Sequence, residues 1–250
     1  MTKTPSHPPF YFIVTFWGEK FSKLFLDVCL SSLLSPNNIP VLNEDRRSKF
    51  LIVTTKQDWE NIKNTRKFRY LSNFIEPVFI NIGPFSKCTS KMQLMSQGHK
   101  LASKVAFADD ALGVFLTPDL ILSDGSVLTL KKYAIDGQQA VLCAAVRFSW
   151  EDCKDTLQAL TYDDEHNRII LSPRQLNHLV LDKLHSETRR YDWQSNFYCT
   201  YPISSFWKLP NDQGIVIHTY SWAPLLLNYP AIIEHNTETF DSWTLDGDYV

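Results

Sequence analysis

The sequence predicts an α/β protein built on a mainly parallel, doubly wound sheet. Short apolar runs rich in β-branched and aromatic residues recur along its first half, segments with helical spacing of apolar residues separate them, and turn-forming residues stand at the junctions. The predicted strands cover residues 10–16, 50–54, 78–82 and 112–116. This alternation of strands and helices favours a parallel sheet with right-handed crossovers.

The first predicted strand ends at Trp17-Gly18, and a helix is expected after it. Ser35-Pro36-Asn37-Asn38 breaks this helix before the strand at 50–54. The apolar positions that give the helix its periodicity are Phe21, Leu24, Phe25 and Val28.

Two further helices complete the pattern. A more polar one is predicted over residues 57–66, and a longer one over about 90–108, where Leu94, Leu101, Ala102 and Val105 share one side. The second of these leads into the strand at 112–116.

Beyond Gly125 the pattern changes. Residues 127–134 and 140–148 are predicted to pair as antiparallel strands across Asp136-Gly137. Ser172-Pro173 predicts a helix start, and residues 214–218 a short strand. The expected organisation is one domain with two halves, residues 1–130 and 131–250.

Composition limits the possible functions. The chain has 250 residues, a net charge of −2 and 44% hydrophobic residues, so it can bury a core but presents no basic field for nucleic acid. No apolar run approaches the ~20 residues that span a bilayer, and residues 1–9 do not resemble a signal peptide. A cytoplasmic location is expected. The cysteines are odd in number and scattered, which favours reduced thiols (Cys29, Cys88, Cys143, Cys153 and Cys199).

The segment after the fourth predicted strand holds the main candidate site. Pro118 ends the strand, and Asp119 and Asp124 follow it in a turn that closes at Gly125. Because ligands of open α/β sheets bind outside the carboxyl ends of the strands, these carboxylates are placed to bind a divalent cation or a sugar hydroxyl. The alternative is that they only cap a tight turn.

These features together resemble a GT-A type glycosyltransferase. The resemblance covers about the first 130 residues: the strand and turn ending in Trp17-Gly18, the second strand with Asp58 after it, and the Pro118-Asp119 turn. It implies a Rossmann-like GT-A fold with a smaller mixed acceptor region in the second half. The implied activity is transfer of a sugar from a nucleotide diphosphate sugar to a carbohydrate or lipid-linked acceptor.

The resemblance also implies roles for particular residues. Thr15 and Trp17 would border the nucleotide, and Asp58 would accept a hydrogen bond from the base or ribose. Lys104 would reach the diphosphate or be a solvated helix lysine. Peripheral contact with a membrane is compatible with a lipid-linked acceptor.

The family's Asp-x-Asp motif, which holds Mn²⁺ or Mg²⁺, is Thr117-Pro118-Asp119 in this chain. Asp124 is the candidate replacement for the missing carboxylate, and His218 the candidate third ligand at the end of the strand at 214–218. His218 is alternatively a hydrogen-bonded core or rim residue. The alternative is a site that binds no cation, in which basic residues neutralise the phosphates of the donor.

The acidic C-terminal segment offers Asp246 and Asp248 as general base or sugar contact, or as a solvated turn. Two other functions stay open: a non-catalytic nucleotide or glycan binding module, and a metal-dependent hydrolase that uses Asp119, Asp124 and His218.

Overall fold

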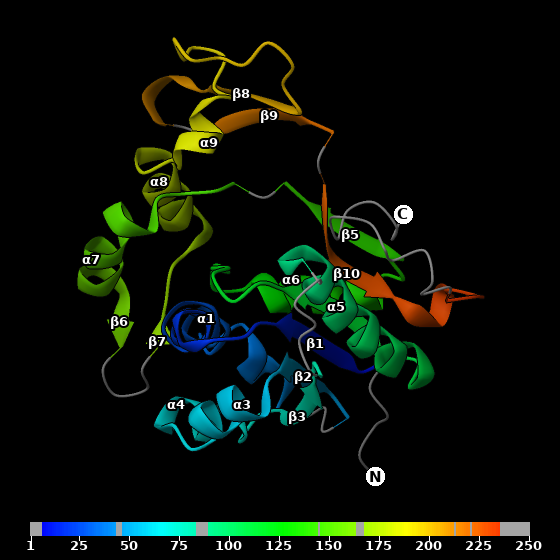
Figure 1. Cartoon of the computed structure of the whole chain (residues 1–250). Coiled ribbons are helices and arrows are strands. Elements are labelled where there is room, and N and C mark those ends of the chain that lie inside the picture. Colours follow the sequence, from blue (N-terminus) through cyan, green and yellow to red (C-terminus); the bar gives the residue numbers. More distant parts are fainter. Residues whose placement is uncertain are drawn as a thin grey trace.

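The structure is a computed structural model that describes residues 7–43, 47–83, 90–144, 146–163, 168–212, 214–220 and 222–235. Within these residues, the main sheet has six strands in the order β3-β2-β1-β4-β10-β5 (Figure 1). Strands β1 to β4 are parallel, and β10 is antiparallel to both of its neighbours. This confirms the α/β class and the mostly parallel sheet. The strands are β1 Phe10–Thr15, β2 Lys49–Thr54, β3 Glu76–Asn81, β4 Leu112–Leu116, β5 Ala140–Cys143 and β10 Ala223–Asn228.

Helices connect the parallel strands as the sequence predicts. Three of them begin with a threonine or serine cap, Thr55, Thr65 or Ser90. The hydroxyl of each cap accepts a hydrogen bond from the backbone N–H three residues later in the first helical turn. The helices are α1 Glu19–Leu24, α2 Leu30–Leu33, α3 Lys56–Lys63, α4 Arg66–Leu71, α5 Lys91–Ala108 and α6 Ser126–Ile135. A π-helical turn, Phe25–Cys29, joins α1 to α2, and a 3₁₀ turn, Ile39–Leu42, follows.

Two apolar layers cover the sheet. One face carries Phe12 and Phe50, which pack with side chains from the π-helical turn and from α2, α3, α4 and α6. The other carries Ile13 and Val53, which pack mainly against α5. Each central strand is therefore buried on both faces, which explains why these strands appear in the sequence as continuous apolar runs.

The predicted hairpin of residues 127–134 and 140–148 is wrong, because residues 126–135 form helix α6. Val127, Leu130 and Ala134 are the buried residues of α6, and their spacing is helical. Gly137, with φ of 78°, lies in the turn at the end of this helix rather than between two strands. Strand β5 pairs with β10 instead.

The second half continues with helices and two small antiparallel sheets. It includes α7 Trp150–Thr161, β6 Tyr162–Asp163, β7 Arg168–Ile169, α8 Pro173–Asp182, α9 Ser186–Arg189, β8 Ser204–Lys208 and β9 Ile215–Thr219. The β8–β9 hairpin lies at the end of the molecule opposite α3 and α4 (Figure 1). A short 3₁₀ turn, Pro210–Asp212, follows β8, and another, Tyr229–Ala231, follows β10. The predicted boundary at residue 130 falls within α6.

A third apolar cluster attaches α7 and α8 to the rest of the protein. Cys153 and Leu157 from α7 and Leu179 from α8 pack with Val28 of the π-helical turn and with Ile121. Ile121 belongs to the acidic turn after β4, so the second half packs directly on the segment that the sequence predicts as the site.

Candidate functional site at the carboxyl edge of the sheet

The order of the strands defines a crevice position in this sheet. From β1 the chain proceeds through β2 to β3 on one side, and then returns to β4 on the other side of β1. The carboxyl ends of β1 and β4 are neighbours, with Val14 opposite Leu116. Such a reversal is where ligands of open α/β sheets bind. Trp17, two residues after β1, and Asp119, three residues after β4, are both predicted site residues.

Asp58 fixes the turn between β1 and α1. Its Oδ2 accepts hydrogen bonds from the Gly18 N–H at 2.9 Å and from the Thr55 hydroxyl at 2.6 Å, and its Oδ1 accepts one from the Ser22 hydroxyl at 3.1 Å. The side chain is buried. Gly18 has φ of 86° and ψ of 155°, a conformation available essentially to glycine alone. Asp58 therefore stabilises this loop through hydrogen bonds. Contact between Asp58 and a nucleotide stays a prediction.

Thr15 and Trp17 lie at the end of β1 in different environments. Thr15 is buried, and its Oγ1 has no hydrogen-bond partner among the described residues. Trp17 is half-buried and packs at the margin of the apolar layer that α5 covers. Of the two, only Trp17 offers side-chain surface to a ligand at this edge.

Asp119 is exposed, and its carboxylate makes no hydrogen bond or ion pair with another described residue. Pro118 before it is buried, and the Leu120 N–H bonds back to the Thr117 carbonyl, so the turn itself is ordered. Burial, and then the Asp119 charge, raise the pKa of the Cys29 thiol, which places this carboxylate beside the π-helical turn. Within the described part of the chain, Asp119 is an unpaired carboxylate at the carboxyl edge.

Asp124, by contrast, binds the chain's own loop. Its Oδ1 accepts a hydrogen bond from the Asn37 N–H at 2.9 Å, and its Oδ2 accepts one from the Asn37 side-chain amide at 2.7 Å. Burial would raise the pKa of Asp124, but the hydrogen bonds from Asn37, with smaller effects of Ser35 and Arg168, outweigh it and hold this pKa below its usual value. Asp124 therefore binds a loop distant in sequence rather than capping its own turn.

Asn38 is a positioning residue that the sequence analysis did not identify. It is fully buried, and its amide donates to the carbonyls of Ser32 and Ser123 while its Oδ1 accepts from the Val127 N–H. It thus ties α2 to both ends of the turn that precedes α6. In the sequence Asn38 is only one of several helix-breaking residues, because a loop asparagine gives no sign of its distant partners.

The three predicted metal ligands do not form one site in the described structure. His218 lies on the β8–β9 hairpin, exposed and in edge contact with Tyr220, and both oxygens of Asp124 are used by Asn37. Among the described residues, no three His, Cys, Asp or Glu side chains are grouped as a metal would require. Of the three predicted ligands, only Asp119 has a carboxylate at the carboxyl edge that no other described residue uses.

Lys104 lies away from the predicted diphosphate position. Helix α5 runs from Gly98, which contacts Thr15 at the carboxyl edge, towards Asp109, which contacts Tyr11 at the opposite edge. Lys104 is exposed and lies between Gly98 and Asp109. The pKa of His235 is lowered, first by the burial of the His235 ring and then by the positive charge of Lys104. Its predicted phosphate contact is untested. Asp246 and Asp248 lie outside the described residues.

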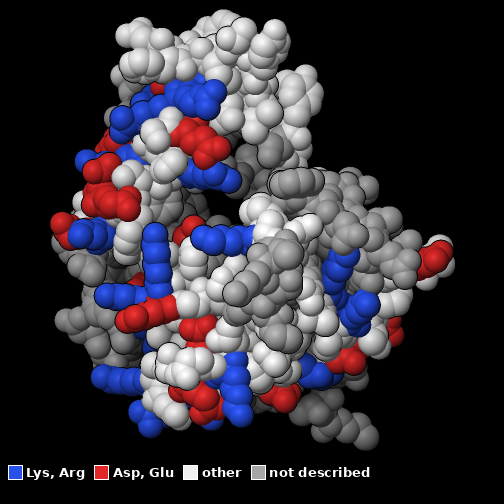
Figure 2. All heavy atoms as spheres, viewed as in Figure 1, with Lys and Arg blue, Asp and Glu red and all other residues white. Residues whose placement is uncertain are grey.

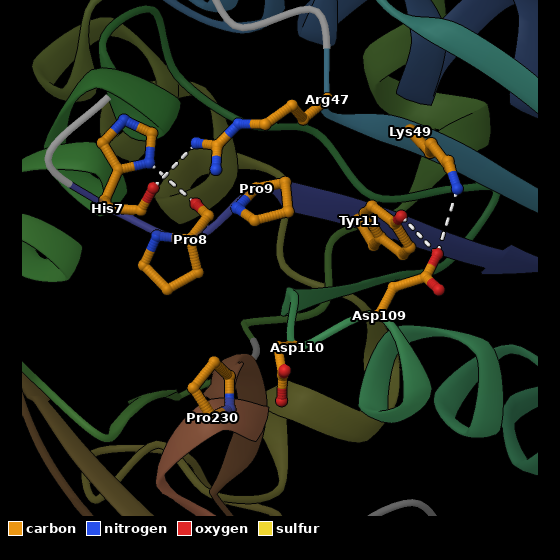
Figure 3. Close-up of a pocket in the computed structure, with 9 residues that line it drawn as sticks. All are labelled: His7, Pro8, Pro9, Tyr11, Arg47, Lys49, Asp109, Asp110 and Pro230. Carbon is orange, nitrogen blue, oxygen red and sulfur yellow. Dashed lines mark hydrogen bonds and ion pairs between the residues drawn. The ribbon is translucent and has the colours of Figure 1, made fainter. Parts of the chain in front are cut away.

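An open hollow is found at the amino edge of the sheet (Figure 3). In it, the Tyr11 hydroxyl donates to Asp109 Oδ2 at 2.6 Å, and Lys49 Nζ bonds to the same oxygen at 3.0 Å. The hydrogen bonds from Tyr11, and then from Lys49, lower the pKa of Asp109. Tyr11, Lys49 and Asp109 are thus paired with one another, and the hollow lies at the end of the strands opposite to Asp119. Its remaining lining residues are His7, Pro8, Pro9, Arg47, Asp110 and Pro230.

His99 is a buried titratable group on α5, next to Gly98. Neither ring nitrogen has a hydrogen-bond partner among the described residues, and the ring contacts Phe115 edge-on. Burial lowers its pKa to about 4, so the imidazole is neutral at physiological pH. It is a core residue rather than a ligand.

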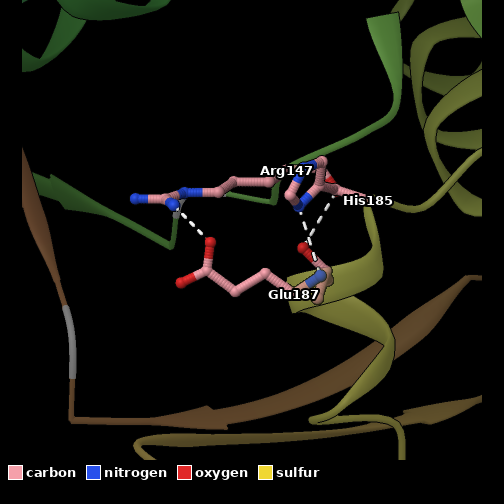
Figure 4. A network of polar contacts seen from close by, with 4 residues as sticks. Arg147, His185 and Glu187 are labelled. Carbon is pink, nitrogen blue, oxygen red and sulfur yellow. Dashed lines mark hydrogen bonds and ion pairs between the residues drawn. The ribbon is translucent and has the colours of Figure 1, made fainter. Parts of the chain in front are cut away.

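A polar contact joins the segment before α7 to α9 (Figure 4). Arg147 Nη1 bonds to Glu187 Oε2 at 2.6 Å, and the Glu187 N–H bonds to Nδ1 of His185, which caps α9. The His185 N–H in turn donates to the Arg147 carbonyl. These contacts attach the base of the hairpin region to the connection that leaves β5.

Comparison of the sequence with known families and proteins gives no relative: no family model and no curated protein matches it. Within the described residues, no helix has the length and apolar character that crossing a bilayer requires. The proposal below therefore depends on the fold and on the residues at the carboxyl edge.

Proposed function

We propose that this chain is a GT-A type glycosyltransferase that transfers a sugar from a nucleotide diphosphate sugar to a carbohydrate or lipid-linked acceptor. The observation that supports this most is the crevice position between β1 and β4, where half-buried Trp17 and exposed Asp119 follow neighbouring parallel strands. An α/β sheet with a polar, unpaired carboxylate at its point of reversal has the arrangement expected of a nucleotide-binding edge.

Each residue at this edge has a distinct part in the proposal. Trp17 packs against the nucleotide with its indole ring, which combines a large apolar surface with one N–H donor. Gly18 brings backbone close to the ligand because it has no side chain, and Asp58 keeps this turn in place through the Gly18 N–H. The rigid turn is ordered before the donor binds, which reduces the entropy cost of positioning it.

Asp119 acts on the diphosphate side of the donor. Mg²⁺ bound to a diphosphate needs only one or two protein carboxylates, so Asp119 with phosphate oxygens and water is a sufficient ligand set for Mn²⁺ or Mg²⁺. A bound cation would stabilise the charge on the departing diphosphate. Asp124 and Asn38 serve the site indirectly, since they hold the turn that presents Asp119.

The acceptor side is assigned to the second half of the chain. Helices α7 and α8 pack through Ile121 on the same turn that presents Asp119. A general base for the acceptor hydroxyl remains assigned to Asp246 or Asp248. A cytoplasmic location stays a prediction from the sequence.

The test is isothermal titration of the full chain with UDP, GDP and CDP sugars, with and without Mn²⁺. We expect one donor to bind, and Asp119→Asn to weaken its binding by about tenfold or more in the presence of Mn²⁺, as for loss of a charged contact. The matched control is Asp110→Asn, the same change at an exposed aspartate of the amino edge. Absence of binding by every donor would refute the proposal.

A non-catalytic nucleotide or glycan binding module is the second candidate, because the acidic motif is reduced to one free carboxylate. It predicts donor binding without turnover. Nucleotide release measured against a panel of sugar acceptors separates the two. The hydrolase alternative receives no support from the described residues, since Asp124 is bonded to Asn37 and not grouped with Asp119 and His218.

A further inference from the structure

The β8–β9 hairpin and the segment before it expose an unusual number of large apolar side chains. Tyr201 is 91% exposed, and Phe197 and Tyr220 are each 80% exposed. We call this surface the aromatic end; it consists of Trp193, Phe197, Tyr198, Tyr201, Ile203, Trp207, Val216, Tyr220 and Trp222. Contiguous exposed apolar surface of this kind marks an interaction site more often than a chance feature.

Backbone pairing and ring contacts join these residues into one surface. Trp207 lies opposite Val216 in the hairpin, and the Trp193 ring packs on Trp207 with centroids 5.8 Å apart. The Tyr220 N–H bonds to the Ile203 carbonyl. Phe206, the neighbour of Trp207, is buried, so the hairpin has one inner and one outer face.

Hydrogen bonds between side chains of the hairpin and the segment before it use the Tyr198 hydroxyl and three serine or threonine hydroxyls. Ser204 Oγ and Thr219 Oγ1 form a hydrogen bond at 2.6 Å, and the Tyr198 hydroxyl bonds to Ser205 Oγ. The surface also includes the aliphatic side chains of Ile203 and Val216, each about half exposed. An exposed surface that combines aromatic with aliphatic side chains suits an apolar partner.

Charge is segregated around this surface. Neither residues 193–207 nor residues 213–233 contain a lysine, arginine, aspartate or glutamate. Exposed Arg189, Arg190 and Lys208 lie at its margin together with half-buried Asp192, whose Oδ1 accepts a hydrogen bond from the Gln194 N–H. Glu187, also at this margin, is paired with Arg147. Figure 2 shows this end as uncharged atoms, with blue and red side chains gathered below it.

We propose that the aromatic end docks on the surface of a phospholipid bilayer. Tryptophan and tyrosine favour the headgroup level of a membrane because their rings are apolar with one polar atom. The basic residues at the margin complement the phosphates of anionic lipids. The chain would thus lie on a membrane through this end without crossing it.

The test is co-sedimentation of the full chain with phosphatidylcholine vesicles, with and without phosphatidylglycerol. We expect the wild type to sediment with vesicles, and most strongly with the anionic ones. The triple variant Phe197→Ser/Tyr201→Ser/Tyr220→Ser should lower the partition coefficient by about tenfold or more, because it removes the most exposed rings. Arg189→Gln/Arg190→Gln should weaken binding to anionic vesicles alone and reduce its salt dependence.

The matched control is Leu128→Ser/Ile135→Ser, which removes exposed apolar side chains from α6 and should bind as the wild type does. Unchanged thermal unfolding of each variant verifies folding. The proposal is overturned if the wild type stays in the supernatant with both kinds of vesicle, or if the triple variant binds like the wild type. Retention on a polysaccharide gel without vesicle binding would identify a glycan platform instead. Since no nucleotide is added, this result is independent of the proposed transferase activity.

Discussion

Gly98 of α5 lies directly against Thr15 at the end of β1. A Cβ atom on Gly98 would be 2.4 Å from Thr15 Cγ2 and 2.7 Å from Thr15 Oγ1. Helix and strand therefore approach each other closely at the carboxyl edge, next to the turn that holds Trp17. The mid-helix glycine, which costs helix stability, is explained by this contact.

We expect Gly98→Ala to lower the free energy of unfolding by about 1–3 kcal/mol, since the added methyl group overpacks the contact. Urea denaturation measures this value. The double variant Gly98→Ala/Thr15→Ala should recover part of the loss, because it removes both of the closest Thr15 atoms. Simple additivity of the two single changes would show that the Thr15 contact is not the cause.

Asp58 provides the second prediction. Asp58→Ala leaves the Gly18 N–H and the hydroxyls of Ser22 and Thr55 without their acceptor, so we expect a loss of about 2–3 kcal/mol in the free energy of unfolding. Asp58→Asn retains one oxygen and should lose less. Urea denaturation again gives the value. An exposed acid on β3 supplies the control, Glu76→Ala, and equal stability of the two alanine variants would contradict the prediction.

The third prediction concerns Lys67, which is buried below the π-helical turn. Its Nζ bonds to the Leu26 carbonyl and to Ser31 Oγ, each at 2.7 Å. Burial, opposed by the nearby Asp27, lowers its pKa from 10.5 to about 8. A neutral amine still has two N–H groups, so both hydrogen bonds survive deprotonation.

Between pH 8 and 10.5 the unfolded chain keeps the Lys67 proton while the folded chain releases it. The contribution of Lys67 to the free energy of unfolding therefore rises with pH over this interval. Over this interval the wild type should gain about 3 kcal/mol in unfolding free energy relative to Lys67→Met, and no further change should occur below pH 8. Denaturation at a series of pH values measures the difference. For the exposed Lys132→Met, the difference from the wild type should stay constant; a constant difference for Lys67→Met would contradict the prediction.

Much of the fold could be predicted from local patterns. Strand β4 was predicted with its observed bounds, and Ser172-Pro173 correctly marked the start of α8, because both signals are local. Helix α6 was misread as a strand since Asp136-Gly137 suits either a hairpin turn or a helix end. Strand β10 was not singled out, because its short apolar run gives no indication of the distant strands β4 and β5 with which it pairs.

The candidate site, like the fold, was predictable from the sequence only where the signals are local. The sequence placed Trp17 and Asp119 after apolar strands, and the parallel pairing of β1 with β4 brings those strand ends together. It assigned Asp119 to the metal-motif position and Asp124 as the replacement for the missing carboxylate, so both were expected to be available to a cation. The structure distinguishes them, because Asn37 reaches Asp124 from a loop far along the chain and leaves Asp119 unpaired.

Local patterns in the amino-acid sequence suffice for the α/β class, for the alternation of the first four strands with helices, and for the position of a carboxylate after β4. These depend on periodicity and turn chemistry, which act over a few residues. The folded chain is needed to show which polar groups are used internally, as with Asp58 and Lys67, and which aromatic side chains gather at one end. Those outcomes depend on contacts between residues distant in sequence, and such contacts form only when the chain has folded.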